Sequence, residues 1–479
     1  MGPRPAGITL SRWLYDEIRG AILDGRLPAG ARLPATRDLA SLYGISRRTA
    51  VAVFEQLALE GYLCGKVGSG TRVNETLPDD LLNVRRARRR RPEPVSPTPA
   101  LEERRPARPF RAIEPALLEF PVELWARVAS RRMRRLPASV LAGGEPAGFL
   151  PLRQALAEYL GASRGVRCEP AQIAIVSGVQ QAVDLLARLL VRPGDSVWIE
   201  DPGYSGTVAA FRNAGARIVA VRVDNDGLDV AAGRRASPNA RLAYITPAHQ
   251  FPLGVTMGLD RRLQLLKWAR ESGARIIEDD YDSEFRFHGR PIPALQGLDR
   301  SGSVIYTGTL NKVLFPGLRL AYVVLPPDLV DSFLALRSAA DRYPPAISQA
   351  VLCDFIVEGH FGRHLRRMRE MYAERLGLLQ DNARRYLAGI AELPSIQAGL
   401  NTPAYLVNGL SSAEAQARAA DRGIETVALD RFALKRRDLH GLVLGFAAFN
   451  AREIKQGVLA LAEALRSAPH RHSPMPARR

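Results

Sequence analysis

Residues 306–312 read Tyr-Thr-Gly-Thr-Leu-Asn-Lys, and Arg319 follows shortly after them. This stretch places one lysine directly after a polar segment that contains glycine. A lysine amine can form a Schiff base with an aldehyde, and a lowered pKa helps it to do so. The hydroxyls of Thr307 and Thr309 and the guanidinium of Arg319 could hold a phosphate group nearby. A single lysine is far more often a surface residue, so the interpretation of Lys312 depends on its surroundings.

An acidic segment follows an apolar run earlier in the chain. Residues 275–277 are Arg-Ile-Ile, and residues 278–282 read Glu-Asp-Asp-Tyr-Asp. Ligands of open α/β sheets bind at the carboxyl ends of the strands. There, Asp279 could pair with a pyridinium nitrogen, and Tyr281 could reach a ring hydroxyl from the same face of the strand. A solvated acidic turn or a metal site is the alternative, but no His-plus-acid motif of standard metal-ligand spacing lies nearby.

Three further turns carry groups that suit a flat, anionic ligand. Gly178 and Val179 stand between an apolar run and a helical segment, where backbone N–H groups can bind an anion. Tyr204 lies in an Asp-Pro-Gly-Tyr turn and could stack on a flat heterocycle. His249 follows another apolar run. Each has an ordinary structural alternative: such strand-to-helix turns are common, tyrosines in turns often pack, and a single histidine is usually only hydrogen-bonded.

Short β-branched runs alternate with longer amphipathic segments around these motifs. This alternation predicts an α/β domain built on a mainly parallel sheet. The predicted strands include residues 173–176, 196–199, 217–221, 242–245 and 275–277, and the predicted helices include residues 180–191 and 261–272.

The chain of 479 residues is too long for one ordinary core, which predicts two or more domains. Its 46% hydrophobic and 24% charged residues are typical of a folded, soluble protein. No apolar run approaches the ~20 residues that cross a bilayer, and the N-terminus lacks a signal-peptide pattern. Three widely spaced cysteines, Cys64, Cys168 and Cys353, predict free thiols in a reducing cytoplasm.

A net charge of +18 favours a polyanionic partner, although arginine can also reflect genome composition. Part of the charge is concentrated in an arginine run over residues 85–91, before a Pro-rich stretch. This composition predicts an extended linker, which either contacts phosphates or acts as a solvated spacer. We expect a small DNA-binding domain over residues 8–74, a basic linker over 75–110, a large domain over 111–468 and a disordered basic tail over 469–479.

The N-terminal module shows the spacing of a helix-turn-helix. A helical apolar pattern over residues 14–23 precedes a second helix start, for which Thr36 is a possible cap. After a break that contains Gly44, Ser46 can cap a third helix, whose first turn carries Arg-Arg-Thr. That turn is where a recognition helix contacts base edges and phosphates. Residues 66–73 then predict a β-hairpin with a small, flexible tip.

Residues 27–30 (Leu-Pro-Ala-Gly), 46–49 (Ser-Arg-Arg-Thr), 60–63 (Glu-Gly-Tyr-Leu) and 68–71 (Gly-Ser-Gly-Thr) closely resemble the GntR-family winged helix. The resemblance covers nearly the whole module and implies binding to double-stranded operator DNA. An interaction module that has lost DNA binding is the alternative. The DNA contacts that the resemblance implies come from Arg37, Ser46, Arg47, Arg48, Thr49, Gly68, Ser69 and Gly70, with Arg32 as a further candidate.

The motifs of the large domain, from about Ala138 to Leu465, closely resemble the aminotransferase domain of the MocR/GabR subfamily of GntR regulators. The order of the Ser-Gly-Val-Gln-Gln, Asp-Pro-Gly-Tyr, His-Gln-Phe-Pro-Leu-Gly and Gly-Thr-Leu-Asn-Lys motifs carries this resemblance. It implies an α/β winged helix-turn-helix followed by an α/β fold-type I aminotransferase-like domain with pyridoxal 5'-phosphate linked to Lys312. The implied cofactor contacts are Asp279 at the pyridine nitrogen, Tyr281 at the ring oxygen, Tyr204 stacked on the ring, Gly178, Val179, Thr309 and Arg319 at the phosphate, and His249.

The same resemblance implies a homodimer with the cofactor at the subunit interface and the winged helix of one chain against the large domain of the other. A two-fold dimer predicts two related half-sites on DNA. Four positions depart from the usual pattern: Val443 replaces a carboxylate-binding arginine, residues 205–207 lack another arginine, Asn401 replaces histidine and Asn311 replaces serine. Arg431 is a possible substitute for effector binding. The departures leave the effector open.

We therefore favour a transcription regulator whose large domain senses an amino acid, an amine or pyridoxal phosphate. Such a response requires the ligand to bind two conformations unequally. The alternative is an active aminotransferase with an autoregulatory DNA-binding domain, and weak transamination could coexist with regulation. The complete N-terminal module favours the regulator. A purely structural DNA-binding dimer fits poorly, because Lys312 and the acidic segment are present.

Overall fold

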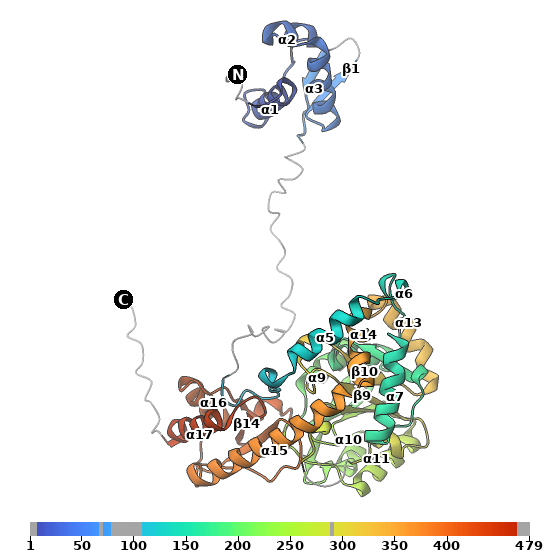
Figure 1. Cartoon of the computed structure of the whole chain (residues 1–479), viewed down its shortest axis with the longest axis vertical. Helices are drawn as coiled ribbons and strands as arrows, with labels where there is room; N and C mark the ends of the chain where they lie inside the picture. Colours follow the sequence, from blue (N-terminus) through green and yellow to red (C-terminus); the bar gives the residue numbers. More distant parts are fainter. Residues whose placement is uncertain (1–6, 67–69, 78–107, 288–291, 467–479) are drawn as a thin grey trace. The chain divides into compact units, whose positions relative to one another are not determined.

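The computed structural model describes residues 7–66, 70–77, 108–287 and 292–466. Backbone contacts divide the chain into two compact units, Met1–Arg104 and Arg105–Arg479 (Figure 1). Most of the predicted linker, the tip of the predicted hairpin and the predicted basic tail lie outside the described residues. No helix in the described part of the chain is long and apolar enough to cross a bilayer.

The first unit is a three-helix bundle with a two-stranded antiparallel hairpin. Its elements are α1 (Leu10–Leu23), α2 (Thr36–Tyr43), α3 (Arg47–Leu59), β1 (Leu63–Lys66) and β2 (Gly70–Val73). Leu14 and Ile18 of α1 are buried against Val53 and Leu57 of α3, as the helical apolar spacing requires. This unit therefore has a core of its own.

The capping predictions for this unit had different outcomes. The Ser46 hydroxyl accepts a hydrogen bond from the Thr49 N–H at 3.0 Å, which confirms Ser46 as the cap of α3. Thr36 was wrong as a cap, because it is the first helical residue of α2. Ala35 occupies the cap position in an extended conformation and offers no side-chain acceptor. Gly44 ends α2 in the left-handed conformation, with φ of 61°.

An eight-stranded sheet forms the centre of the second unit, in the order β3-β10-β9-β8-β7-β4-β5-β6. Strands β9, β8, β7, β4 and β5 pair in parallel, and β10 is antiparallel to both of its neighbours, β9 and β3. The strands are β3 (Ile173–Val176), β4 (Ser196–Asp201), β5 (Arg217–Asp224), β6 (Gly227–Leu228), β7 (Leu242–Ile245), β8 (Arg275–Asp280), β9 (Val304–Thr309) and β10 (Ala321–Val324). This confirms the mainly parallel sheet. It also places the carboxyl ends of β3, β4, β7, β8 and β9 along one edge.

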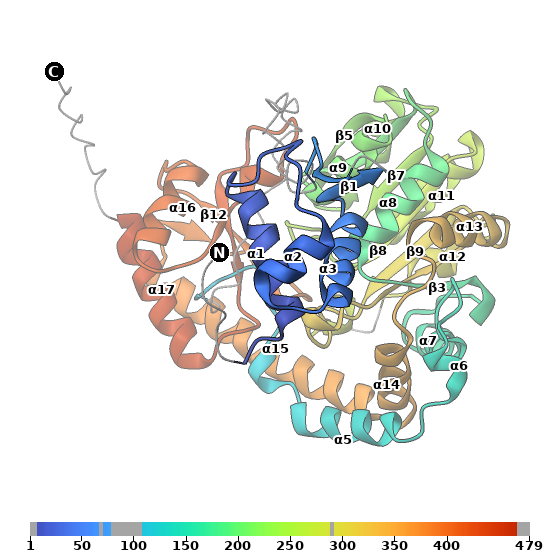
Figure 2. The same ribbon diagram turned by 90° about the horizontal axis from the view of Figure 1, so that it is seen from above.

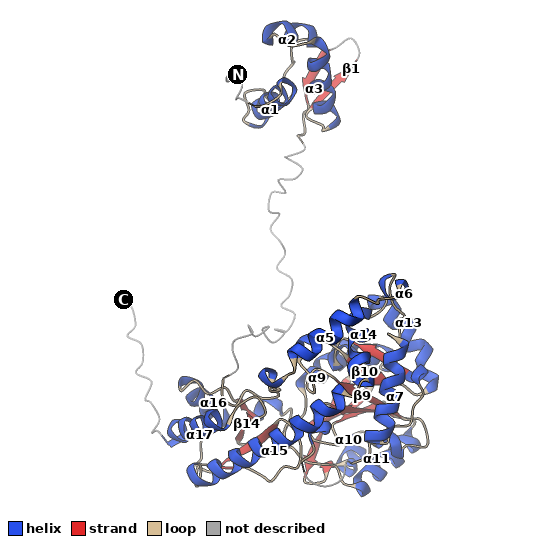
Figure 3. Cartoon of the chain, in the orientation of Figure 1, coloured by secondary structure: helices blue, strands red, loops and turns tan. Residues whose placement is uncertain are grey.

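Helices cover both faces of this sheet, so its strands are buried on both sides and read as continuous apolar runs (Figure 3). On one face, α8 (Val179–Leu190) packs Val183 and Leu186 against Val197. On the other face, Trp268 of α11 (Leu259–Ser272) stacks on Trp198 with ring centroids 3.8 Å apart. Each fully buried large side chain contributes roughly 1.5–3 kcal/mol to stability.

A smaller antiparallel sheet lies at one end of this unit, in both Figure 1 and Figure 2. Its strands, in the order β11-β12-β14-β13, are β11 (Ala391–Glu392), β12 (Asn401–Leu406), β14 (Gly441–Gly445) and β13 (Val427–Ala428). The long helix α15 (His360–Tyr386) and helices α16 (Ser412–Asp421) and α17 (Ala451–Arg466) pack with it. We call residues 391–466 the small lobe.

The remaining helices complete the large unit and flank the central sheet. They are α5 (Val122–Met133), α6 (Ala138–Leu141), α7 (Leu150–Arg164), α9 (Ser205–Asn213), α10 (Val230–Ala236), α12 (Leu295–Leu298), α13 (Val330–Asp341) and α14 (Ala346–Val357). Phe110, the last residue of the predicted linker, is fully buried in the core that includes α15 and α17.

Candidate functional site

The residues of the large unit that the sequence predicts to bind the ring and aldehyde of the cofactor lie along the carboxyl edge of the central sheet. Lys312 follows β9, Asp279 lies near the end of β8, and His249 follows β7. Tyr204 follows β4, and Gly178 lies between β3 and α8. Because these five strands run in the same direction, residues that are far apart in the sequence meet at one edge.

The Lys312 side chain points its amine at a backbone carbonyl. Its Nζ donates a hydrogen bond to the Ile113 carbonyl oxygen at 3.1 Å. Burial lowers the pKa of Lys312, while the negative charges of Glu114 and Asp282 oppose this shift. A lowered pKa increases the fraction of neutral amine, which is the nucleophilic form.

Asp279 is a buried carboxylate that accepts hydrogen bonds from two hydroxyls. The Tyr244 hydroxyl donates to it, and the Thr307 hydroxyl lies 3.4 Å away. Burial raises the pKa of Asp279 to about 7, and these two hydrogen bonds work against that shift. A cationic ring nitrogen beside this carboxylate would favour its ionised form. Thr307 was wrong as a phosphate contact, since its hydroxyl is fully buried and donates to the Glu278 carbonyl at 3.3 Å.

Tyr281, His249 and Asp282 form a hydrogen-bonded triad, in which His249 and Asp282 are buried and Tyr281 is half-buried. His249 Nδ1 lies 3.0 Å from both carboxylate oxygens of Asp282 and 3.0 Å from the Tyr281 hydroxyl. Burial raises the pKa of Asp282, and His249 opposes the shift. His249 Nε2 is buried without a partner among the described residues. The ring also fits closely under Gly399, where a Cβ would lie 2.0 Å from His249 Cε1.

Tyr204 lies close to Asp279. Its hydroxyl donates to Gln180 Oε1 at 3.3 Å, and its pKa is raised by burial and by the charge of Asp279. The turn that carries Tyr204 is fixed by Asp201, whose carboxylate accepts three backbone N–H bonds from residues 434–436 of the small lobe. The ring position of Tyr204 is therefore coupled to the small lobe.

Three of the four residues predicted for the phosphate, Gly178, Val179 and Arg319, lie at the N-terminus of α8, and Thr309 ends β9. Gly178 is the N-cap of that 12-residue helix, and Val179 is its first residue. A Cβ at Gly178 would lie 3.8 Å from the Arg319 guanidinium, so the two residues are neighbours. Arg319 is exposed, and the Thr309 hydroxyl accepts the Asn311 N–H at 3.2 Å. A helix N-terminus beside an arginine suits a phosphate dianion.

Behind Asp279, a buried ion pair supports the end of β8. Arg164 contacts Asp280 at 2.7 Å, with side-chain exposures of 4% and 2%, and the Tyr306 hydroxyl donates to Asp280 at 2.6 Å. Burial and the charge of Asp280 raise the pKa of nearby Glu284 to about 8. Sequence reasoning missed Arg164, because it precedes Asp280 by 116 positions and no local pattern joins them.

Arg431, the predicted effector contact, lies in a different place. It is exposed and lines a cavity of about 210 Å³ between α9 and the turn Leu429–Phe432, together with Arg212 and Ser205. Lys312 does not line this cavity. Val443, at the position where an arginine is usual, is fully buried in β14.

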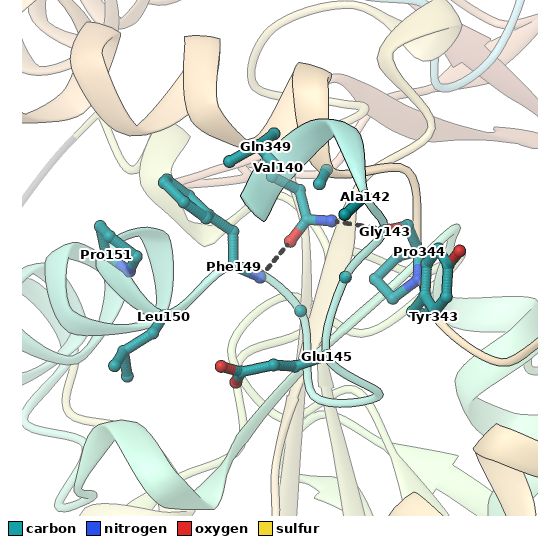
Figure 4. A pocket seen from close by; sticks show the side chains of 13 residues that line it. Val140, Ala142, Gly143, Glu145, Phe149, Leu150, Pro151, Tyr343, Pro344 and Gln349 are labelled. Atoms are coloured by element: carbon teal, nitrogen blue, oxygen red, sulfur yellow. Dashed lines mark hydrogen bonds between the residues drawn. The ribbon is translucent and has the colours of Figure 1, made fainter. Parts of the chain in front are cut away.

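A larger cavity, of about 480 Å³, lies between residues 140–151 and 343–349 (Figure 4). Gln349 spans it by accepting the Phe149 N–H at 2.8 Å and donating to the Pro345 carbonyl at 2.8 Å. None of the predicted cofactor residues lines this cavity. Within the described ranges, no three His, Cys, Asp or Glu side chains gather as a metal site.

In the first unit, Ser46, Arg47, Arg48 and Thr49 lie at the start of α3, while Arg37 lies in the first turn of α2. Arg37, Ser46, Arg47 and Arg48 are exposed, and Thr49 is half-buried. Gly70 begins β2, and a Cβ there would lie 3.0 Å from the Arg32 side chain. Arg32 is thus placed at the base of the wing. Gly68 and Ser69 lie outside the described residues.

Comparison with known proteins agrees with both units. Residues 10–73 match the family of bacterial regulatory proteins, gntR family, and residues 119–422 match aminotransferase class I and II. The chain is 40% identical over 471 residues to the probable rhizopine catabolism regulatory protein MocR of Rhizobium meliloti, covering 96% of this chain and 94% of that protein.

Two solved aminotransferases resemble the large unit. Kynurenine aminotransferase from Pyrococcus horikoshii, determined with PMP, has a TM-score of 0.70 and 27% identity, covering 76% of this chain and 95% of that chain. The α-aminoadipate aminotransferase LysN from Thermus thermophilus, complexed with N-(5'-phosphopyridoxyl)-L-leucine, has a TM-score of 0.69 and 30% identity. It covers 74% of this chain and 91% of that chain.

Proposed function

Because the chain belongs to the MocR/GabR subfamily of GntR-type transcription regulators, we propose that it regulates transcription in response to a ligand of a bound pyridoxal phosphate. Its winged helix binds operator DNA, and its aminotransferase-like domain senses an amine, an amino acid or the cofactor itself. The observation that carries this proposal is the combination, in one chain, of exposed arginines at the start of α3 with Lys312 and Asp279 on one sheet edge.

The residues along this edge fit pyridoxal phosphate. Lys312 is the amine for its aldehyde, and Asp279 is the carboxylate for its ring nitrogen. Gly178 and Arg319 form a cradle of the right charge for its phosphate, and a Cβ at position 178 would reduce the space there. When bound, the cofactor supplies an aldehyde that captures amines and a ring that takes up electron density.

The protein groups prepare this site in specific ways. Burial keeps part of Lys312 neutral, and the Ile113 carbonyl orients its amine. Tyr244 and Thr307 hold the Asp279 carboxylate in place. Asp282 fixes the His249 ring, which in turn positions the Tyr281 hydroxyl.

On the DNA side, the first turn of α3 presents two arginines to the major groove and to phosphates. Arg47 and Arg48 are exposed, and Ser46 fixes the start of the helix by capping it. Arg32 and Gly70 are neighbours at the base of the β1–β2 hairpin, which is the wing of this module. Cations contribute most of the sequence-independent affinity, and base contacts add specificity.

A homodimer would cover exposed apolar side chains of the large unit. Leu118, Val122, Leu141, Tyr343 and Ile347 are all exposed, and Leu141 and Tyr343 flank or line the 480 Å³ cavity. Exposed apolar side chains that gather in one patch are typical of an interface. A second copy of the chain would cover it and produce two operator half-sites.

An active aminotransferase is the second candidate. The presence of both Lys312 and Asp279 favours it, because these two groups suffice to place a reactive ring in the aminotransferase fold. The exposed arginines of the winged helix add nothing to transamination, so the regulator explains more of the chain.

The test is a visible absorption titration of the purified full-length protein with pyridoxal phosphate and then with a panel of amines and amino acids. We expect a covalent band that is abolished in Lys312→Ala, and that shifts and stays with one class of ligand. Repeated conversion and recovery with a keto acid would establish the enzyme instead. A borohydride-stable adduct in Lys312→Ala would contradict the lysine assignment, and a light-scattering mass of one chain would contradict the dimer.

A further inference from the structure

Residues 109–116, which we call the strap, begin with the last two residues of the predicted linker and continue into the large unit. Their N-terminal half is fixed to the small lobe. The Pro109 carbonyl accepts the Glu425 N–H at 2.9 Å, and the Phe110 carbonyl accepts the Gly445 N–H at 2.9 Å. Arg111 adds a two-pronged contact to the Glu425 carboxylate, at 2.9 and 2.8 Å. The linker side of the strap therefore moves with the small lobe.

This half of the strap packs tightly against the small lobe. Phe110 is fully buried, and a Cβ at Gly457 would lie 2.9 Å from its ring. A Cβ at Gly445 would lie 1.9 Å from the Arg111 carbonyl oxygen. The Phe110 ring and the Arg111 backbone can approach the small lobe this closely only because positions 457 and 445 lack a side chain.

The C-terminal half of the strap is fixed to Lys312. The Ile113 carbonyl accepts the hydrogen bond from Lys312 Nζ at 3.1 Å, and the Ala116 N–H donates to the Tyr372 hydroxyl of α15 at 3.0 Å. Ile113 has a φ of 60°, which β-branched residues rarely adopt. A strained conformation of this kind persists only where surrounding contacts hold it. The Lys312 amine is one of these contacts.

We propose that the strap reports the bonding state of Lys312 to the linker: the free amine holds the strap through Ile113, and capture of the amine by the cofactor releases it. The inference rests on the proposed function, in which Lys312 is the residue that binds pyridoxal phosphate. It adds a mechanical connection between that residue and the chain that leads to the winged helix.

The chemistry changes the number of hydrogens on the lysine nitrogen. When the neutral amine condenses with the aldehyde, its nitrogen forms a double bond to the aldehyde carbon, and the oxygen leaves as water with the two hydrogens of the amine. The planar nitrogen that remains carries at most one hydrogen. When an amine effector takes over the cofactor carbon, it passes its two hydrogens to Lys312, and the free amine can bind Ile113 again. An amine effector thus returns the strap to the state of the cofactor-free chain.

The experiment measures hydrogen exchange of the peptide that spans the strap, together with operator affinity, in the full-length protein with and without pyridoxal phosphate. We expect loading with pyridoxal phosphate to speed exchange of the strap amides several-fold and to change operator affinity by about fivefold or more, which is the usual size of an allosteric coupling.

The discriminating variant is Arg111→Gln, which removes the fork to Glu425 and leaves Lys312 and its neighbours in place. It should keep the covalent absorption band but reduce the difference in operator affinity between the cofactor-free and loaded forms, because only the backbone bonds of Pro109 and Phe110 then hold the strap to the small lobe. Its matched control is Arg422→Gln, which removes another small-lobe ion pair, to Glu463, outside the strap. That control should keep the difference.

Equal exchange of the strap in the two forms, or equal operator affinity in the two forms of the wild type, would overturn the proposal. A full affinity difference in Arg111→Gln would also overturn it. These outcomes leave the proposed function intact if the covalent band forms and the operator is bound. Absence of the band with added pyridoxal phosphate would instead overturn the assignment of Lys312, and the inference with it.

Discussion

In the winged helix, Arg47 and Arg48 are exposed at the start of α3, whereas in the large unit Arg164 is buried against Asp280. The exposed pair remains hydrated and available, so it can exchange counterions for phosphates of a partner. The buried arginine is already paired with Asp280, so its charge stabilises the end of β8, the strand that carries Asp279. The same residue type therefore recognises a ligand in one unit and holds a site together in the other.

The largest effect should come from breaking the buried pair. Arg164→Ala leaves Asp280 buried without its cation, and we expect the free energy of unfolding to fall by about 3–5 kcal/mol. The measurement is urea unfolding of the large unit in the full-length protein. Arg188→Ala is the control, because Arg188 forms a half-exposed helical pair with Asp184 at 3.2 Å and should cost no more than about 1 kcal/mol. Equal losses of unfolding free energy in Arg164→Ala and Arg188→Ala would show that the buried ion pair matters no more than the exposed one.

The exposed side of the comparison is tested by Arg47→Ala. We expect operator binding to weaken by about 1–3 kcal/mol and its salt dependence to become less steep, while the cofactor absorbance stays the same. Fluorescence anisotropy with a labelled operator at several salt concentrations measures both quantities. Arg12→Ala is the matched control, since Arg12 is an exposed arginine of α1 that pairs with Asp16 at 3.0 Å. If Arg12→Ala weakened binding as much, α3 would not be the recognition helix.

The third prediction concerns pH and sharpens the account of the buried cluster. The pKa of Glu284 is raised to about 8 in the folded chain, so there it keeps a proton that the unfolded chain loses above its ordinary pKa of about 4.5. Stability from this group is therefore greatest at low pH and is lost as pH rises towards 8, by up to about 1.4 kcal/mol per unit.

Glu284→Gln cannot ionise, so its stability relative to the wild type should increase as pH rises from 5 to 8. Urea unfolding at pH 5, 6.5 and 8 measures this difference. A constant difference across the three pH values would show that Glu284 is already ionised in the folded protein.

Local patterns in the sequence predict much of this fold. The apolar, β-branched runs of β4, β7 and β8 predict strands because buried parallel strands require such residues on both faces. The strand β9 was missed, since Thr307, Gly308 and Thr309 give it a polar, turn-like composition. The Thr307 hydroxyl is satisfied by a neighbouring carbonyl and a carboxylate, which only the folded sheet provides.

In the candidate site too, some residues can be predicted from local sequence and others cannot. Lys312 and Asp279 stand out because each lies in a motif with its own chemistry. The Ile113 carbonyl could not be predicted, because a backbone acceptor has no sequence signature and lies 199 positions from Lys312. Asp282 was part of the acidic segment, but its role depends on His249, which approaches from another strand.

The close approach of Gly399 to the His249 ring limits how this site can change over generations. A side chain at position 399 would occupy the space of the imidazole, and the φ of 99° there disfavours any residue with a Cβ. Replacement of Gly399 is therefore tolerable only after the ring at position 249 has become smaller and the loop has rearranged. Substitutions at positions 249 and 399 should therefore be correlated, so that relatives which keep the histidine also keep the glycine.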